Sequence, residues 1–360
     1  MTDVGKLALG VTWNGDRVSA TEIRSTRPMV SQLLKGKPPA QVLQIVPLLF
    51  SVCGKAQGAA TGAALQAAQH GTAAISNAEL ARIVCEVLQE HLWRLLLDWP
   101  KLLGLPQQEN DFRHWHALLR KISRGEVEMA VFLGEFERLC LTMMAADWRM
   151  LSDDQSLRNW LSAGQSPLAR LLSTLNTLEL RGRGMRAPRL LPAWSAVEAQ
   201  QACAGNWDAA YAARPHWRGA AAETGAWSYY ADSPLLRDVW RRSESKVLAR
   251  LLARTIDVVA LAQGDYAGRL DAGSPAAGEG IAVVRTARGL LLHRVRLEAD
   301  RVADYTVIAP TEWNFHPEGA FAQDMRGHAA QNVEGLKQFA NFEAMSLDPC
   351  VTYEVDIRNA

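Results

Sequence analysis

Two cysteines near opposite ends of the sequence, Cys53 and Cys350, have the clearest potential for metal chemistry. Cys53 directly precedes an alanine-rich stretch that we expect to be helical, and the positive end of a helix favours thiolate over thiol. Cys350 follows Asp348-Pro349, where the proline fixes the backbone just before the cysteine. Thiolates are soft ligands that suit transition metals. The alternative for both residues is a small buried hydrophobic side chain, which is how free cysteine usually behaves.

The other candidate ligands lack a spacing that suits a metal site. Cys85, Cys140 and Cys203 are not paired, and the first two lie in helical patterns, so we expect those two in the core. His114 and His116 are two residues apart, and such positions do not share a helix face, which favours surface or hydrogen-bonded histidines. Tryptophan is abundant, and we expect packing roles for its members, among them Trp207, Trp217 and Trp227.

Composition excludes several classes of function. The formal net charge of +1 gives no field that would attract nucleic acid or a membrane surface. No apolar run is long enough to span a bilayer, and the N-terminus lacks the pattern of a secretory signal. We therefore expect a cytoplasmic protein, in which the five cysteines are thiols or metal ligands rather than disulfides.

Hydrophobic periodicity predicts a mainly α-helical α+β protein with small β elements near both ends, and the length permits one large or two ordinary domains. Asn14-Gly15 predicts a type I′ turn in a β-hairpin. Within the helical body, a helix ends before Pro100, and an alanine- and glycine-rich helix suits a place where backbones approach closely. Residues 271–280 are expected to be a loop. The expected parts are a hairpin at 6–24, a helical body at 38–264, a β/turn region at 281–318, and a C-terminal helix with an Asp-Pro-Cys motif at 331–360.

The helical body contains several distinct helical patterns. Pro47 must kink or interrupt the first of them, and Ser76 with Glu79 predicts a capping box at the start of the clearest one. Residues 181–234 are expected to be long connections with short helices. The expected helices cover residues 40–52, 56–69, 79–98, 127–148 and 243–262, and the last helix of the chain covers 331–344.

Three motifs, in this order, resemble the large subunit of nickel–iron hydrogenases. The first is an arginine-led turn from Arg24, followed by Val52-Cys53-Gly54 and the alanine-rich stretch. The second is Ala287-Arg288-Gly289 with His293 and Tyr305, then Pro310-Thr311-Glu312-Trp313-Asn314. The third is Leu347-Asp348-Pro349-Cys350. In the family, two Cys-any-any-Cys pairs hold nickel and an iron that carries cyanides and carbon monoxide. The resemblance covers roughly residues 6–100 and 281–360, and it implies one domain over residues 1–360 that is folded like a trimmed large subunit.

The departures from the family pattern argue against hydrogen turnover. The partner positions of Cys53 and Cys350 hold Ala56 and Tyr353, so two of the four thiolates are missing. The family's C-terminal metal-ligand histidine falls on Asp356, and its acidic proton-relay residue falls on Arg27. Two thiolates without a bridging pair hold nickel poorly. We therefore expect no nickel and no enzyme activity. The chain ends four residues after Asp356, as expected for a chain without the family's removable C-terminal extension.

What is retained resembles hydrogenase-maturation proteins of the HupK and HoxV type. This resemblance implies a scaffold that transiently binds an Fe(CN)2CO unit through Cys53 and Cys350 in a buried pocket. It also implies that Arg288, Pro310 and Thr311 contact the unit, since a guanidinium is a good donor to cyanide nitrogen. The implied partners are a small maturation chaperone with the iron-loading complex, and the apo large subunit.

Three alternatives stay open. Both retained cysteines match the nickel-side member of each family pair, so either the iron shifts toward Cys53 and Cys350 or these thiols serve another purpose. The chain could instead be a metal-free interaction protein that docks chaperones or subunits, or, against the missing ligands, an active metal enzyme. Arg288 could be an ordinary salt-bridge arginine, and His293 a hydrogen-bonded structural histidine.

Overall fold

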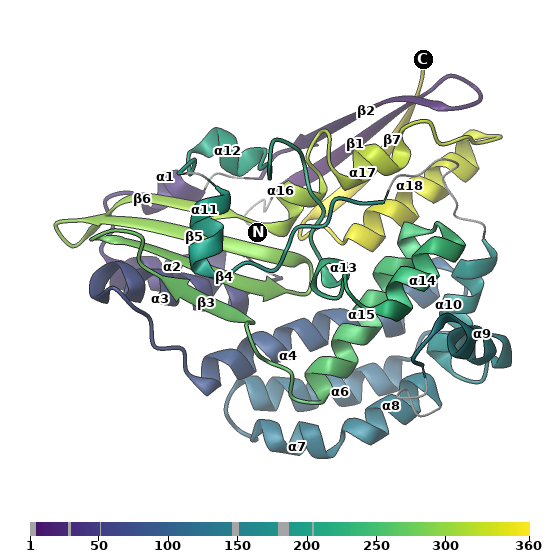
Figure 1. Ribbon diagram of the computed structural model, residues 1–360, viewed down its shortest axis with the longest axis horizontal. Coiled ribbons are helices and arrows are strands. Elements are labelled where there is room, and N and C mark those ends of the chain that lie inside the picture. Colours follow the sequence, from purple (N-terminus) through teal and green to yellow (C-terminus); the bar gives the residue numbers. More distant parts are fainter. Residues whose placement is uncertain (1–4, 28–29, 51, 146–150, 179–186, 204) are drawn as a thin grey trace. The chain divides into compact units, whose positions relative to one another are not determined.

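The computed structural model describes residues 5–27, 30–50, 52–145, 151–178, 187–203 and 205–360. In this part of the chain helices predominate and two small sheets accompany them, which confirms the expected fold class (Figure 1). The contacts form two compact units: unit 1 comprises Met1–Glu79, Arg186–Ser228 and Ala267–Ala360, and unit 2 comprises Leu80–Met185 and Tyr229–Tyr266. The expectation of one domain over residues 1–360 stays a prediction. None of the described helices is long and apolar enough to cross a membrane.

The first sheet of unit 1 joins the N-terminal hairpin to the end of the chain. β1 (Lys6–Trp13) and β2 (Val18–Ser25) pair antiparallel, which confirms the hairpin expected at 6–24. β7 (Thr352–Asn359) pairs with β1 in parallel, and Figure 1 shows the yellow strand beside the purple one. This strand corrects the expectation of only a helix and a cysteine motif at 331–360. Its partner β1 is distant in sequence, so no local turn motif predicts the pairing.

The hairpin turn differs from the predicted type. Its central residues are Gly15 and Asp16, because the Asn14 backbone N–H donates to the Arg17 carbonyl. Gly15 has a φ of +96°, whereas Asp16 is not among the residues with positive φ, so the turn is not type I′. Asn14 acts through its side chain, whose oxygen accepts from the backbone N–H groups of Asp16 and Arg17 at 3.1 and 2.8 Å.

The second sheet of unit 1 is antiparallel, with the order β3-β4-β5-β6. Three of its strands and the short helix α16 (Pro310–Asn314) confirm the β/turn region expected at 281–318. β3 corrects the loop expected at 271–280, since Leu270 pairs with Val284 of β4. The short sequence of β3 shows no hydrophobic alternation, so only its pairing with β4 identifies it as a strand. The bounds are β3 (Leu270–Gly273), β4 (Glu279–Thr286), β5 (Gly289–Glu298) and β6 (Arg301–Ile308).

The alanine-rich helix α3 (Gly54–His70) packs directly on β4. A Cβ atom on Gly280 of β4 would lie 1.9 Å from the Ala64 carbonyl oxygen and 2.6 Å from the Ala68 nitrogen. The expectation of close backbone approach is therefore confirmed. The preceding helix, α2 (Pro39–Leu49), contains Pro47 within it and ends earlier than the expected 40–52.

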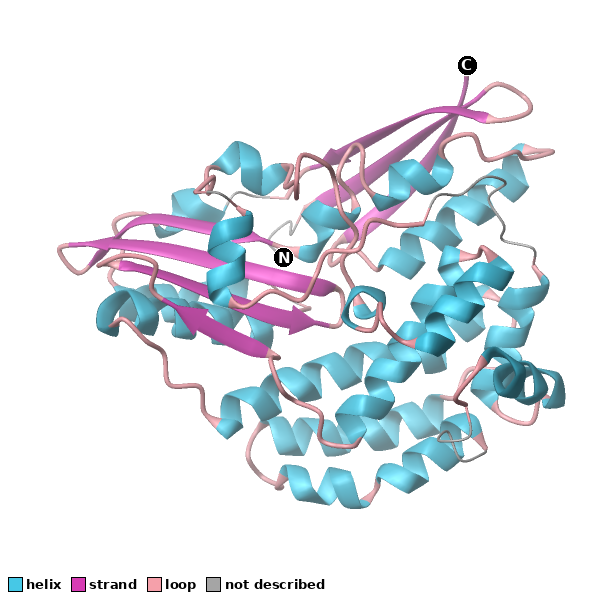
Figure 2. Cartoon of the chain, viewed as in Figure 1, coloured by secondary structure: helices cyan, strands magenta, loops and turns pink. Residues whose placement is uncertain are grey.

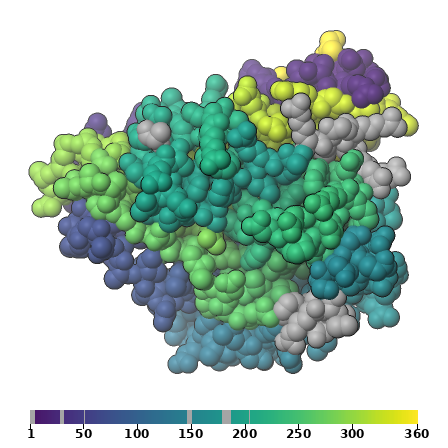
Figure 3. All heavy atoms as spheres, viewed as in Figure 1, coloured from purple at the N-terminus to yellow at the C-terminus, as the bar shows by residue number. Residues whose placement is uncertain are grey.

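Side chains from the other face of the second sheet form an aromatic core. Ile281 and Val283 of β4 alternate with the positions that face α3, and they pack in a cluster with Trp194, Trp207 and Trp313. α11 (Ala196–Ala202) crosses this face in Figure 2, and the atoms of α11 and α12 (Ala209–Ala213) cover much of it in Figure 3. The packing roles expected for the tryptophans are confirmed for Trp207 and for Trp217, which lies against this cluster.

Short helices complete the described part of unit 1. The expected C-terminal helix is confirmed as α18, whose C-cap Asp348 has a φ of +54°. α13 crosses the boundary between the two units. The bounds are α1 (Val30–Leu34), α13 (Ala226–Tyr229), α17 (Ala320–Met325) and α18 (Val333–Leu347).

In unit 2 the described elements are helices. The first, α4, begins with the expected cap, in which the Glu79 carboxylate accepts from the Ser76 backbone N–H at 2.9 Å and the Glu79 N–H donates to the Ser76 hydroxyl at 3.2 Å. Two helices, α7 and α8, replace the single one expected at 127–148, of which residues 146–148 lie outside the described ranges. The bounds are α4 (Asn77–Trp93), α6 (Glu109–Ser123), α7 (Met129–Gly134), α8 (Phe136–Met144), α9 (Asp154–Ala163), α10 (Pro167–Thr177), α14 (Pro234–Ser243) and α15 (Lys246–Ala262).

Pro100 does not end the first helix of unit 2, which corrects the expectation. A π-helical turn, η1 (Arg94–Asp98), follows α4, and α5 (Trp99–Leu102) contains Pro100 near its start. The Trp99 N–H donates to the Arg94 carbonyl, five residues back. This wider turn accommodates a proline that has no N–H of its own.

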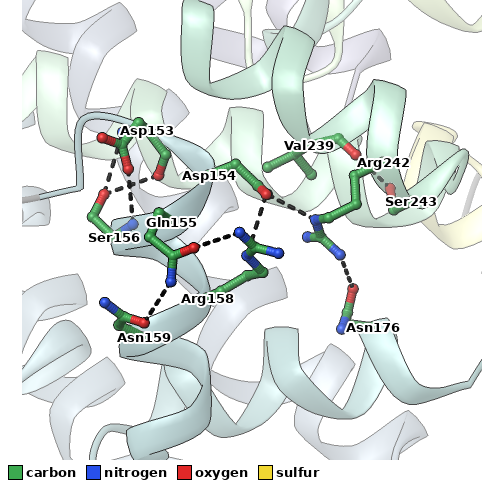
Figure 4. Close-up of polar contacts among 10 residues, drawn as sticks. All are labelled: Asp153, Asp154, Gln155, Ser156, Arg158, Asn159, Asn176, Val239, Arg242 and Ser243. Atoms are coloured by element: carbon green, nitrogen blue, oxygen red, sulfur yellow. Dashed lines mark hydrogen bonds and ion pairs between the residues drawn. The ribbon is translucent and has the colours of Figure 1, made fainter.

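Arg242 of α14 links three helices of unit 2. Figure 4 shows its guanidinium between two acceptors, Asp154 Oδ1 at 2.8 Å and Asn176 Oδ1 at 3.2 Å. Arg158 also lies 3.4 Å from the Asp154 carboxylate. These contacts join α9, α10 and α14 through charge-assisted hydrogen bonds.

Candidate functional site

Cys53 is the N-cap residue of α3, as the sequence predicts. Its thiol is only partly buried, because the chain turns at the surface here and the preceding Val52 is exposed. The buried pocket expected around the two cysteines stays a prediction. The Gln57 side-chain amide, one helical turn further along, donates to the Cys53 Sγ at 3.6 Å.

Cys350 lies between the end of α18 and the start of β7, and it is also partly buried. Thr311 of α16 contacts it twice: the Thr311 hydroxyl lies 3.2 Å from the Cys350 Sγ and accepts from the Cys350 backbone N–H at 3.3 Å. Pro310 is the first residue of α16, so its ring helps to orient the helix that carries Thr311. The structure therefore brings Thr311 to Cys350.

Arg27 is a largely buried cation whose pKa depends on both cysteines. Its guanidinium donates to Glu312 Oε1 at 2.5 Å, and only 11% of its side chain is exposed. Burial by itself lowers the pKa of Arg27. The Glu312 carboxylate, then the Cys350 and Cys53 sulfurs, act in the opposite direction and hold this pKa above its ordinary value. Both thiols thus lie within the electrostatic reach of one buried cation.

Arg288 lies at the Asp-Pro-Cys turn. Its guanidinium is 3.5 Å from the Asp348 carboxylate, and both side chains are almost fully buried. The two residues are thus consistent with an ordinary salt bridge. Asp348 precedes Cys350 by two residues, so this ion pair restrains the backbone that leads to the cysteine.

Thr224 links the turn that contains Arg288 to the helix that contains Asn314. Its hydroxyl accepts from the Leu290 N–H at 2.9 Å, directly after the turn that contains Arg288. Its backbone N–H and carbonyl bond to the Asn314 side chain, each at 2.9 Å. A Cβ on Gly289 would lie 2.4 Å from the Thr224 methyl group, so this turn requires glycine.

The remaining candidates behave as core or surface residues. Cys85, Cys140 and Cys203 are buried, and burial raises the pKa of Cys85 to about 12 and that of Cys203 to about 11. His114 is exposed and His116 is half-buried, on α6. Within the described ranges, no three His, Cys, Asp or Glu residues cluster in a way that could hold a metal ion.

Comparison with known proteins identifies the family. The sequence pattern of the family described as "Nickel-dependent hydrogenase" matches residues 209–352. The hydrogenase expression/formation protein HupK of Azotobacter vinelandii is 31% identical over 99% of each chain, and HoxV of Cupriavidus necator is 30% identical over 93% of this chain and 92% of its own. The chain belongs to the HupK/HoxV family of hydrogenase expression/formation proteins.

Solved hydrogenase structures share the fold of this HupK/HoxV-type chain. The Ni-Fe-Se hydrogenase of D. vulgaris Hildenborough aligns over 94% of both chains with a TM-score of 0.60 and 14% identity. An NAD+-reducing NiFe-hydrogenase aligns over 93% of both chains with a TM-score of 0.61 and 13% identity. At this identity the likeness concerns the fold alone.

Three residues of the site in this HupK/HoxV-type chain were missed from the sequence. Gln57 lies four residues after Cys53 on the same helix, and this spacing is a signal that could have found it. Glu312 lies inside a recognised motif, but its role depends on Arg27, which is distant in sequence. Thr224 lies in a stretch expected to be mostly connections and had no signal.

Proposed function

We propose that this HupK/HoxV-type chain is a non-catalytic scaffold that holds the iron–cyanide–carbonyl precursor during maturation of the nickel–iron hydrogenase large subunit. The observation that carries the proposal is that two partly buried cysteines, Cys53 and Cys350, both help to raise the pKa of one largely buried guanidinium, that of Arg27. Iron that arrives with cyanide and carbonyl ligands needs few ligands from the protein, so two thiolates suffice.

Charge supports this cargo. Two thiolates and a cyanide-bearing iron concentrate negative charge, which is costly in a partly buried place unless a cation lies nearby. Arg27 supplies that cation, and a guanidinium needs no proton release to donate hydrogen bonds to cyanide nitrogen. In the proposed site Arg288, Pro310 and Thr311 lie around the cargo, with Thr311 closest to Cys350.

The residues that stand where the family has its other metal ligands support a role without nickel or hydrogen turnover. Tyr353, at the place of the second C-terminal cysteine, lies in β7 opposite Leu7. Asp356, at the place of the metal-ligand histidine, is on the same strand and bonds to Arg358 at 2.7 Å. These side chains form part of a sheet, and Ala56 has no donor atom at all.

The proposed partners follow from the cargo. A small maturation chaperone and the iron-loading complex would deliver the iron unit in the cytoplasm, and the apo large subunit would receive it. The likeness of fold to hydrogenase large subunits supports this, because partners that recognise the large subunit would meet a similar backbone here.

Infrared spectroscopy of anaerobically purified protein, produced with the maturation machinery, tests the proposal. We expect cyanide and carbonyl stretches in the wild type and their loss in Cys53→Ala and in Cys350→Ala. Cys140→Ala is the matched control, since Cys140 is buried in unit 2, and it should retain the bands. Bands that survive both site substitutions would disprove the site. Nickel content with hydrogen-dependent dye reduction would instead establish an enzyme.

A second candidate is a metal-free docking protein, which one observation favours. Leu48 is 83% exposed and Val52 is 40% exposed, just before Cys53 in the sequence. Exposed apolar side chains beside a site suit contact with a partner. Absence of both cyanide and carbonyl bands from the wild type, with the chaperone still co-purifying, would favour this candidate.

A further inference from the structure

A buried series of three polar side chains ends at the sulfur of Cys53. Gln57 Nε2 lies 3.6 Å from Cys53 Sγ, and Gln57 Oε1 lies 2.8 Å from His293 Nε2. On the other side of the ring, His293 Nδ1 lies 2.8 Å from the Tyr305 hydroxyl. Gln57 and His293 have no exposed surface, and Tyr305 is 1% exposed. We call Gln57, His293 and Tyr305 the buried relay.

The hydrogen-bond directions in the buried relay follow from the chemistry of its members. Burial lowers the pKa of His293 to about 3, so its ring is neutral near pH 7 and carries one N–H. An amide oxygen only accepts, so this N–H lies on Nε2 and donates to Gln57. His293 Nδ1 must then accept, and the Tyr305 hydroxyl shares its one proton between this nitrogen, at 2.8 Å, and the Thr61 hydroxyl oxygen, at 3.0 Å. The Gln57 oxygen is thereby engaged, and its N–H faces Cys53.

The two thiols therefore differ in their surroundings. Cys53 receives an N–H donor that a fully buried network holds in one orientation. Cys350 lies 3.2 Å from the Thr311 hydroxyl, which rotates and can either donate or accept. A hydrogen bond to a sulfur ligand withdraws electron density from it and weakens its bond to a metal.

We infer that the buried relay is a positioning device that keeps one N–H donor on Cys53 and so makes Cys53 the weaker of the two iron ligands. The inference rests on the proposed function, because it concerns a bond between this sulfur and the iron cargo. A carrier must release what it holds, and an unequal pair of thiolates lets one bond break first.

Thiol reactivity in metal-free protein tests the relay without any cargo. The measured quantity is the alkylation rate of Cys53 by iodoacetamide, relative to Cys350 in the same chain, at a pH where both rates have reached a plateau. We expect Gln57→Met to raise this ratio by about threefold or more, since a sulfur without the N–H bond is more nucleophilic. Tyr305→Phe should raise it less, although Tyr305 does not touch Cys53 in the relay.

Thr255→Val is the matched control. The Thr255 hydroxyl is also buried, but it donates to the Leu251 carbonyl at 3.0 Å within α15 of unit 2, outside the buried relay. This variant loses a buried polar group and should leave the ratio unchanged. An unchanged ratio in both Gln57→Met and Tyr305→Phe would overturn the inference. If Gln57→Met does not fold, Tyr305→Phe decides alone, because it removes one oxygen atom.

Infrared spectra of the loaded protein give the second readout. A more strongly donating Cys53 sulfur increases electron density at the iron, so the carbonyl stretch should move to lower wavenumber in Gln57→Met and Tyr305→Phe, and stay in place in Thr255→Val. A wild type without bands would defeat the proposed function, while the alkylation ratio would still decide the relay. Bands that do not move in either relay variant would count against the relay alone.

Discussion

At the residue scale, Arg27 has the most unexpected chemistry in the site. The family resemblance gives this position an acidic proton-relay residue, yet here a guanidinium is paired with Glu312. The side chains are 11% and 20% exposed, so this is a largely buried ion pair. Removal of one partner from such a pair is costly, because the other charge then remains buried without compensation.

Glu312→Gln should therefore lower the free energy of unfolding by roughly 2 kcal/mol, less than for a fully buried pair. The double variant Arg27→Met with Glu312→Gln should cost less than the sum of its single variants, since no buried charge is left. Urea denaturation measures both effects. The exposed pair Lys6–Glu354 is the control, and Glu354→Gln should change stability by no more than about 0.5 kcal/mol. A strictly additive double variant would contradict this account.

At the element scale, the helix α3 and the strand β4 lie in direct backbone contact. Gly280 has no room for a side chain, since a Cβ would lie 1.9 Å from a backbone oxygen of α3. Gly280→Ala must push the strand from the helix, and we expect a loss of about 3 kcal/mol or more. Gly273→Ala on neighbouring β3 is the control, because the nearest atom to its Cβ would be 3.7 Å away. Thermal denaturation should separate the two variants clearly.

The elements also show which parts of the fold a sequence can reveal. Local patterns were sufficient to predict the hairpin, α3 and the capping box of α4, because propensity and periodicity depend on residues close together in sequence. β7 was missed, since its register is fixed by β1 at the other end of the chain. The helical turn before Pro100 was also missed, because a π-turn has no sequence period of its own.

The same limit applies to the candidate site. Cys53, Cys350 and Thr311 were found because they lie in recognisable motifs, and the structure brings Thr311 to Cys350. The Arg27–Glu312 pair and the Gln57–His293 contact could not be predicted, because each joins residues that meet only after folding. Such pairs determine the electrostatics of the candidate site, while the motifs supply only the ligands proposed for it.

At the scale of the whole molecule, unit 1 gathers three separate stretches of sequence around the site. Its stability therefore depends on long-range contacts, and buried histidines make that stability depend on pH. His293 is neutral in the folded state, with a pKa that burial lowers to about 3. His328, stacked on Phe339, has a pKa that burial lowers to about 4. In the unfolded chain both histidines take up a proton near pH 6.5.

The sign of the effect follows from proton binding. Between pH 6.5 and the folded pKa values, the unfolded state binds more protons than the folded state. The contribution of these histidines to the free energy of unfolding is therefore complete above pH 6.5 and decreases as the pH falls. Each such histidine contributes a slope of about 1.4 kcal/mol per pH unit in this window. Urea midpoints measured at pH 7, 6 and 5 should therefore decrease steadily. His293→Gln should be less stable than the wild type at pH 7, but its free energy of unfolding should decrease less on acidification. In the double variant with His328→Gln this decrease should be smaller still. A His293→Gln profile parallel to that of the wild type would mean that this histidine is protonated equally in both states.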